Sequence, residues 1–180
     1  MPRTSLISIF ILLVLLGAQV WRPRLLLRLS RYAFFISAFF VFFTAGYFTY
    51  QQYRVWEASP LSRLLLPPHQ PIGYFAQYSV TNFWTGPLIA LVAALICLTA
   101  AKILNKKFGG RFFEPAEPWL FANGLLLTGH PGWIYYAAAV LALALLIAVG
   151  RKTVSFYYLW LPAAIGVIIV NIWFSFPFSN

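Results

Sequence analysis

The stretch GPLIALVAALICLTAAKILNKK, residues 86–107, decides the fold class. It holds no charged residue before Lys102, and lysines follow at its end. A bilayer core about 30 Å thick needs about 20 mostly apolar residues of helix to cross it. This stretch has that length, and its charges come where a helix would reach the lipid–water interface. It therefore predicts a transmembrane helix.

The whole chain has the same character. Of its 180 residues, 62% are hydrophobic and 9% are charged, whereas soluble domains carry about 25% charged residues. This composition excludes a soluble globule and predicts an all-α, polytopic integral membrane helical bundle, formed as a single transmembrane domain by residues 1–180. Hydropathy indicates about six spans, one of them short or broken: 5–21, 33–50, 86–104, 119–129, 133–150 and 156–176.

Basic residues set the expected orientation. The net charge is +10, but the basic residues lie at the ends of apolar segments and not on a polar surface, which argues against nucleic-acid binding. Six spans place three basic groups on one face, which the positive-inside rule makes cytoplasmic, with both termini outside. We expect this face to attract anionic lipid headgroups. The groups are Arg22, Arg24, Arg28 and Arg31; Lys102, Lys106, Lys107 and Arg111; Arg151 and Lys152.

The short segment 119–129 leaves a second topology open. If it dips into the bilayer and returns, Arg151 and Lys152 move outside, and the basic residues divide 8 to 5 between the faces instead of 10 to 3. The six-span topology is favoured because it divides the charges more unequally. In the first segment one arginine precedes the apolar run and four follow, so we expect a membrane anchor and not a cleavable signal peptide.

Residues 51–85 form the longest stretch between apolar segments. Aromatic residues recur along it, and the sequence PPHQP favours an extended proline turn. Tyr and Trp prefer the membrane interface. We therefore expect residues 51–85 to be an extracytoplasmic loop that lies on the outer surface of the membrane.

Small residues within the spans predict seams where helices pack closely. In the second span they share one face, and phenylalanines such as Phe35, Phe39 and Phe43 cover the other. The small residues of that span are Ser37, Ala38, Thr44 and Ala45; later spans carry Ala90, Ala93, Ala94, Cys97, Ala100 and Ala101, and then Ala137, Ala138, Ala139, Ala142, Ala144 and Ala148. Cys97 is the only cysteine, so no internal disulfide forms.

Two of the three acidic residues, Glu114 and Glu117, lie between prolines in RFFEPAEPWL, residues 111–120. If Pro115 is the first helical residue, the Glu117 carboxylate reaches back to free backbone N–H groups. If Pro118 is first, the outcome is similar. Either way, negative charge stabilises the positive end of the helix dipole. Three basic residues are near enough in sequence to pair with these acids: Lys106, Lys107 and Arg111.

The acidic pair is followed by LFANGLLLTGHPGWIYYAAAVLALALLIAVG and then RKTVSFYYLWLPAAIG. In layout, residues 105–170 resemble the C-terminal part of type IV prepilin peptidases, where the aspartate of a GxGD motif opens a glycine-containing helix. The resemblance implies either an inactive shared fold or a peptidase with two acids at the cytoplasmic face. This chain has no aspartate: GGRFFEPAE stands at the GxGD position, and Asn105 is the nearest counterpart of the second acid. The candidate catalytic residues are then Glu114 and Glu117, although one helix start does not supply opposed carboxylates.

The sequence TGHPG, residues 128–132, follows the short segment and resembles the broken helices that bind substrates in carriers. Ion-coupled carriers place ionisable groups within their spans. Here the spans offer polar side chains instead, namely Thr99, Asn123, Thr128 and Asn171. A small carrier with its site near Gly129–Gly132 is therefore a further hypothesis.

Three residues on the expected outer face are candidate metal ligands: His69, His130 and Glu57. A metal site needs three or four converging ligands, and the spacing of these residues does not show convergence. Each histidine adjoins a proline, which is typical of a turn. No cofactor is expected, because the chain has no GxxxxGK[ST], CxxC or HExxH motif.

Packing seams without buried ionisable groups favour a protein that is not an enzyme. We expect a small multi-pass protein of a prokaryotic cytoplasmic membrane, acting as a non-catalytic structural or assembly component of the cell envelope. Its expected partners are the lipid bilayer and another membrane protein.

Overall fold

The computed structural model describes the backbone of residues 2–110, 112–150 and 156–175, and the side chains of 5–110, 112–147 and 156–173. Within these ranges the chain is all-α and has no strand, as the composition predicts. A 3₁₀ helix, η1, spans Ser62–Leu65, and a π-helix, η2, spans Val80–Trp84. The α-helices are α1 (Pro2–Trp21), α2 (Pro23–Ala58), α3 (Ile72–Ser79), α4 (Thr85–Lys107), α5 (Glu117–Thr128), α6 (Gly132–Gly150) and α7 (Trp160–Ser175).

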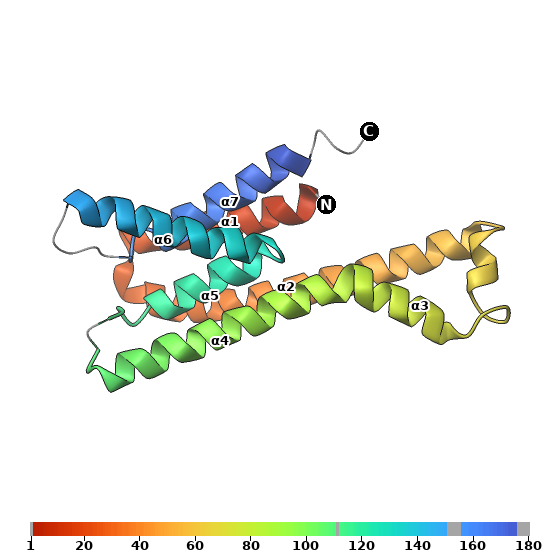
Figure 1. Cartoon of the computed structure of the whole chain (residues 1–180), viewed down its shortest axis with the longest axis horizontal. Helices are drawn as coiled ribbons and strands as arrows, with labels where there is room; N and C mark the ends of the chain where they lie inside the picture. Colours follow the sequence, from red (N-terminus) through yellow and green to blue (C-terminus); the bar gives the residue numbers. More distant parts are fainter. Residues whose placement is uncertain (1, 111, 151–155, 176–180) are drawn as a thin grey trace.

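Six of these helices, α1, α2 and α4 to α7, form one bundle in which successive helices run in alternating directions (Figure 1). The start of α1 and the last turn of α7 lie at the same end of the bundle. The junction of α1 with α2 and the last turn of α4 lie at the opposite end, which we call the basic end because it holds Arg22, Arg24, Lys106 and Lys107. Arg111, Arg151 and Lys152 lie outside the described residues.

The short helix α5 is the centre of the bundle. It contacts α1, α2, α4, α6 and α7, and ten of its twelve residues are buried. Its length is about 18 Å at about 1.5 Å per residue, and it stops short of the end where α1 begins (Figure 1). The expectation of one short apolar helix at 119–129 is confirmed, with the helix beginning at Glu117.

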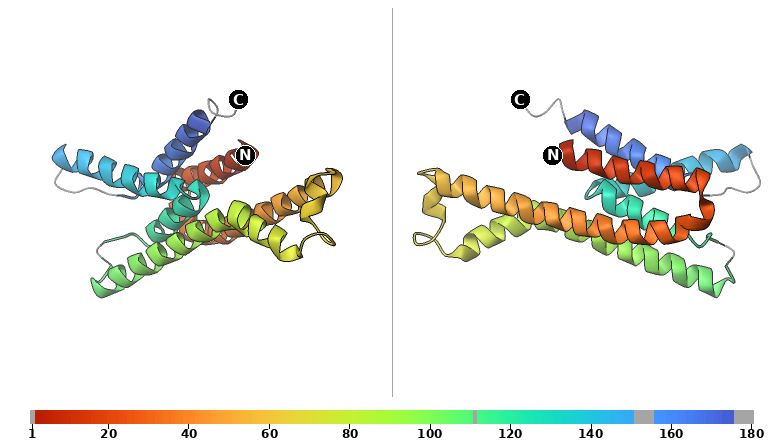
Figure 2. Two further views of the ribbon diagram at one scale, coloured as in Figure 1. Left: turned by 45° about the vertical axis from the view of Figure 1, so that its right-hand side comes forward. Right: turned by 180° about the vertical axis from the view of Figure 1, so that it is seen from behind.

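The hairpin of α2 with α3, η2 and α4 extends well beyond the other helices (Figure 2). We call its projecting part, residues 50–79, the arm. Buried Trp56, Leu66 and Phe75 give the arm a small core of its own. The Trp56 ring lies 5.3 Å from that of Phe75 and 4.8 Å from that of Tyr78, between centroids.

The segment 51–85, expected as a loop, is largely helical. α2 continues to Ala58, and α3, η2 and the start of α4 account for residues 72–85. The segment 22–31, which lies between the first two expected spans, is also helical from Pro23, which has the fixed φ that suits the first turn of a helix. Hydropathy marks where apolar side chains end, whereas the backbone continues as helix through the polar residues that follow.

The expected packing face of α2 is confirmed at Ser37 and Ala45, which are buried, whereas Ala38 and Thr44 are half-buried. Phe35, Phe39 and Phe43 are exposed, as expected. The expected alanine seam of α6 is confirmed only at Ala144. Ala138 and Ala142 are exposed, and larger side chains, Tyr136 and Val140, complete the buried face of α6. The side chain of Ala148 lies outside the described residues.

Two helical segments are long and apolar enough to cross a membrane: Pro23–Ala58 and the continuous helical run Ile72–Lys107. Shorter apolar stretches within α1, α6 and α7 accompany them, at Ser5–Trp21, Gly132–Ile147 and Trp160–Trp173.

Candidate functional site

Glu117 occupies the start of α5 and is 3% exposed. Its Oε2 atom accepts a hydrogen bond of 2.8 Å from the backbone N–H of Glu114. A carboxylate that satisfies a free N–H at a helix start stabilises that start. This contact confirms the prediction that the Glu117 carboxylate reaches back to a free backbone N–H group at a helix start.

Glu114 lies one turn before Glu117 and is exposed. The two candidate catalytic acids thus belong to one turn of chain, and one of them already binds the backbone of the other. Lys106 and Lys107 form no ion pair with either acid within the described residues, where the ion pair is Arg54–Glu57 on the arm, at 3.9 Å. The expected partner Arg111 lies outside the described residues.

Asn105, the counterpart of a second catalytic acid, anchors the connection between α4 and α5. Its Nδ2 donates to the carbonyl of Phe113 at 2.8 Å, and its Oδ1 accepts from the N–H of Phe113 at 3.2 Å. Both ends of the amide are therefore engaged by one backbone residue. This geometry assigns Asn105 to holding the connection in place.

The candidate metal ligands are distributed over distant parts of the chain. Glu57 and His69 belong to the arm, whereas His130 follows α5 in the bundle. Among the described residues, no three His, Cys, Asp or Glu side chains converge to hold a metal ion. His130 accepts a hydrogen bond at Nδ1 from the indole N–H of Trp133, at 3.3 Å.

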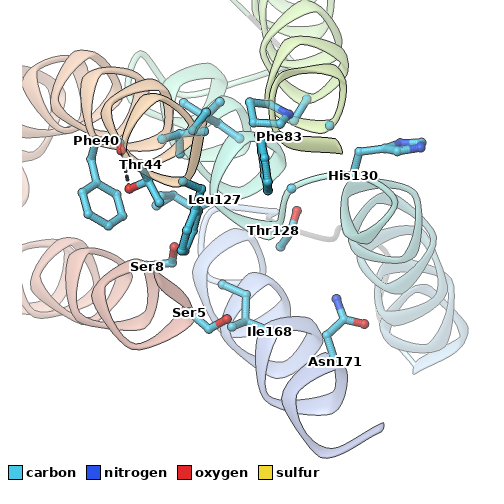
Figure 3. Close-up of a pocket in the computed structure, with 18 of the residues that line it drawn as sticks. Ser5, Ser8, Phe40, Thr44, Phe83, Leu127, Thr128, His130, Ile168 and Asn171 are labelled. Atoms are coloured by element: carbon cyan, nitrogen blue, oxygen red, sulfur yellow. Dashed lines mark hydrogen bonds between the residues drawn. The ribbon is translucent and has the colours of Figure 1, made fainter. Parts of the chain in front are cut away.

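A cavity of about 350 Å³ lies beyond the C-terminal end of α5 (Figure 3). It exists because α5 stops short while α1, α2, α4 and α7 continue past it. Thr128, at the end of α5, points toward its centre, and Phe83 of η2 enters from the opposite wall. The polar side chains along its wall come from five segments: Ser5, Ser8, Thr44, Asn82, Thr128 and Asn171.

Local structure explains the shape of this cavity. Thr128 Oγ1 donates to the Gly124 carbonyl at 2.8 Å, which fixes the orientation of a side chain that lines the cavity. Gly129 then ends the helix at φ 66°, ψ −178°, a conformation that only glycine adopts readily. His130 lines the rim, but its imidazole points away from the cavity (Figure 3).

The sequence identified part of this site. TGHPG marks the break after α5, and Thr128 and Asn171 were expected as polar groups within the spans. Thr44 was expected only as a small residue of a packing seam. Ser8 and Asn82 carry no sequence signal, because each is an ordinary helix position until the helices are packed together.

No protein-family model, curated protein or solved structure matches the chain. The likeness of residues 105–170 to type IV prepilin peptidases therefore stays a hypothesis.

Proposed function

We propose that this chain is a multi-pass membrane protein that acts as a non-catalytic structural or assembly component of the cell envelope. In this proposal α1, α2 and α4 to α7 lie in the bilayer, with α5 as a short central helix. The basic end faces the cytoplasm, and the arm and both termini lie outside.

The outer surface of the bundle supports placement in lipid. Large apolar side chains project outward from several helices, including Phe39 on α2, Ile96 on α4 and Leu145 on α6, with exposed fractions of 73%, 63% and 69%. Monomeric soluble proteins rarely expose contiguous apolar patches of more than a few hundred Å². Hydrocarbon solvates such a surface at no cost.

The observation that carries the proposal is the arm. α2 has 36 residues, which is about 54 Å of helix, against a hydrocarbon core of about 30 Å. Its outer part is therefore expected in water, where the Trp56, Leu66 and Phe75 core keeps the hairpin folded. An arm that holds its own shape beyond the membrane extends the reach of the protein toward a partner in the envelope.

The test uses the native host and measures both protein abundance and rescue of the deletion phenotype. Leu61 and Leu64 are exposed on the arm, at 82% and 51%, so Leu61→Glu with Leu64→Glu changes the arm surface without opening its core. We expect normal abundance and lost rescue. Glu114→Gln should rescue fully.

The converse pattern contradicts the proposal. If Glu114→Gln is present at normal abundance and fails to rescue, while the arm variant rescues, then the acidic pair performs chemistry and the protein is an enzyme of the membrane interface.

A second candidate function is that of a small carrier, which the cavity beyond α5 favours. Its lining is largely apolar with polar groups from several helices, and no Lys, Arg, Asp or Glu among the residues with described side chains lines it, so it suits an uncharged solute. Gly86 lines the cavity, and a Cβ at this position meets nothing within 4 Å. Gly86→Leu therefore places bulk in the cavity without straining the backbone.

Gly73, on the arm, gives the matched control, because a Cβ there also meets nothing within 4 Å. A carrier predicts that Gly86→Leu fails to rescue the deletion phenotype while Gly73→Leu rescues it, both at normal abundance. If Gly86→Leu and Gly73→Leu both rescue the deletion phenotype fully, the carrier hypothesis is excluded.

A further inference from the structure

A second hollow, of about 530 Å³, lies at the basic end between α2, α4 and α5. Three cationic side chains line it: Arg31 from α2, and Lys102 and Lys106 from α4. Pro118 and Trp119, in the first turn of α5, line it from the other side. The connection from α4 to α5 borders the hollow as a fourth segment. The packing of α2 against α4 and α5 thus brings together charges that are far apart in sequence.

Trp119 holds two of these cations. Its ring is buried, with 9% of the residue exposed. The Lys102 Nζ atom lies 4.0 Å from the ring centroid, and the Arg31 Cζ atom lies 5.7 Å from it. The negative face of an indole attracts cations, so one ring fixes two positive charges that repel each other.

No acid compensates these charges. Within the described residues, no carboxylate lies within 4.0 Å of Arg31, Lys102 or Lys106, since the ion pair found there is Arg54–Glu57 on the arm. The nearest acids in sequence, Glu114 and Glu117, form no ion pair among the described residues. The hollow is therefore a site of uncompensated positive charge.

The wall opposite Trp119 is held in place before any ligand arrives. The Asn105 side chain binds the Phe113 backbone through both ends of its amide. The backbone carbonyl of Asn105 accepts a hydrogen bond from the Gly110 N–H at 2.8 Å. Gly109 and Gly110 turn the chain at φ 66° and 77°. A preformed site loses less conformational entropy when it binds a ligand.

We propose that this hollow binds a phosphate group, carried either by an anionic membrane lipid or by a soluble phosphate compound. The Arg31 guanidinium is suited to two parallel hydrogen bonds with phosphate oxygens, and Lys102 and Lys106 add point charges. Basic pockets between helices at the cytoplasmic side of a membrane bind lipid headgroups by this chemistry. The proposal goes beyond the assembly role, and its lipid arm rests on the membrane placement proposed above.

Adjacent lysines provide a sharp test. Lys106 lines the hollow, whereas Lys107 does not and lies 5.8 Å from the Phe108 ring. The full chain, purified in detergent, is titrated with phosphatidylglycerol and with phosphatidylcholine, and bound lipid is counted by native mass spectrometry. We expect tighter binding of phosphatidylglycerol, weakened roughly fivefold by Lys106→Gln and left almost unchanged by Lys107→Gln.

Inorganic phosphate separates the two sources of the ligand. If it displaces phosphatidylglycerol from the wild-type protein at millimolar concentration, the site accepts a soluble phosphate compound. If it does not displace the lipid, the site requires a lipid headgroup.

Two results would overturn the proposal. The first is that Lys106→Gln and Lys107→Gln weaken phosphatidylglycerol binding equally, which indicates attraction to the basic end as a whole and not to this hollow. The second is equal affinity for phosphatidylglycerol and phosphatidylcholine together with no binding of inorganic phosphate. Lys106→Arg keeps the charge and should bind like the wild type. If Lys106→Gln does not fold, the wild-type preference and Lys106→Arg decide.

Discussion

Asn123 of α5 and Ser30 of α2 are joined by a hydrogen bond across the bundle, in which the Asn123 Nδ2 atom donates to the Ser30 carbonyl at 2.9 Å. The same Nδ2 atom donates to the Trp119 carbonyl at 2.8 Å. Both Asn123 and Ser30 are fully buried. This contact ties the short central helix to the long helix that bears the arm.

We expect Asn123→Ala to destabilise the bundle, because it removes both hydrogen bonds and leaves a small void. Hydrogen bonds between membrane helices contribute about 0.6 kcal/mol on average and up to about 1.7 kcal/mol, so a loss of about 1–2 kcal/mol is expected. Thermal unfolding in detergent measures it. Thr81→Ala is the control, because the exposed Thr81 hydroxyl bonds only within its own helical run, to the Gln77 carbonyl. Equal stability of the two variants would contradict the role of Asn123.

Gly124 of α5 lies directly against the ring of Tyr136 of α6. A Cβ added at Gly124 would overlap the ring of Tyr136, which is fully buried. We expect Gly124→Ala to lower the free energy of unfolding by about 1–3 kcal/mol, the usual range for overpacking.

Gly17 supplies the comparison for this seam. A Cβ at Gly17 meets nothing within 4 Å, so Gly17→Ala should leave stability unchanged or raise it, since alanine favours helix more than glycine. If Gly17→Ala is as destabilising as Gly124→Ala, then the packing of α5 against α6 differs from the one described.

Trp56 holds the arm together, and its exposed fraction is 8%. Trp56→Ala removes the ring that contacts Phe75 and Tyr78, so the arm should open while the bundle stays folded. We expect faster tryptic cleavage at Arg63, which is exposed in η1, with little change in the unfolding temperature of the bundle. Tyr50→Ala, an exposed aromatic position on the same helix, should leave the cleavage rate unchanged. Cleavage within the bundle would show that the arm is not an independent unit.

Much of the fold is predictable from the sequence, because apolar segment length alone requires helices at about the right places. The helix ends are not predictable in this way. Arg24 and Arg28 lie between the first two expected spans, yet both belong to α2, since arginine and leucine are good helix formers in water and at an interface alike. The break after Thr128 was predictable, because Gly129 and Pro131 both disfavour a continuing helix.

The candidate sites are predictable only where the chemistry is local. The contact of Glu117 with the Glu114 N–H joins residues three positions apart, so the sequence pattern predicts it. Arg31, Lys102 and Trp119 meet only after α2, α4 and α5 pack together. A single sequence gives no information on such a contact, because each residue also fits an ordinary interfacial position.

Single-cysteine labelling tests the membrane arrangement most directly. On a Cys97→Ala background, Leu61→Cys places a thiol at the exposed tip of the arm and Lys107→Cys places one at the basic end. With a membrane-impermeant thiol reagent on intact cells, we expect labelling of Leu61→Cys, and labelling of Lys107→Cys only after the membrane is opened. The reverse pattern, labelling of both in intact cells, or recovery of the protein in the soluble fraction would contradict the account.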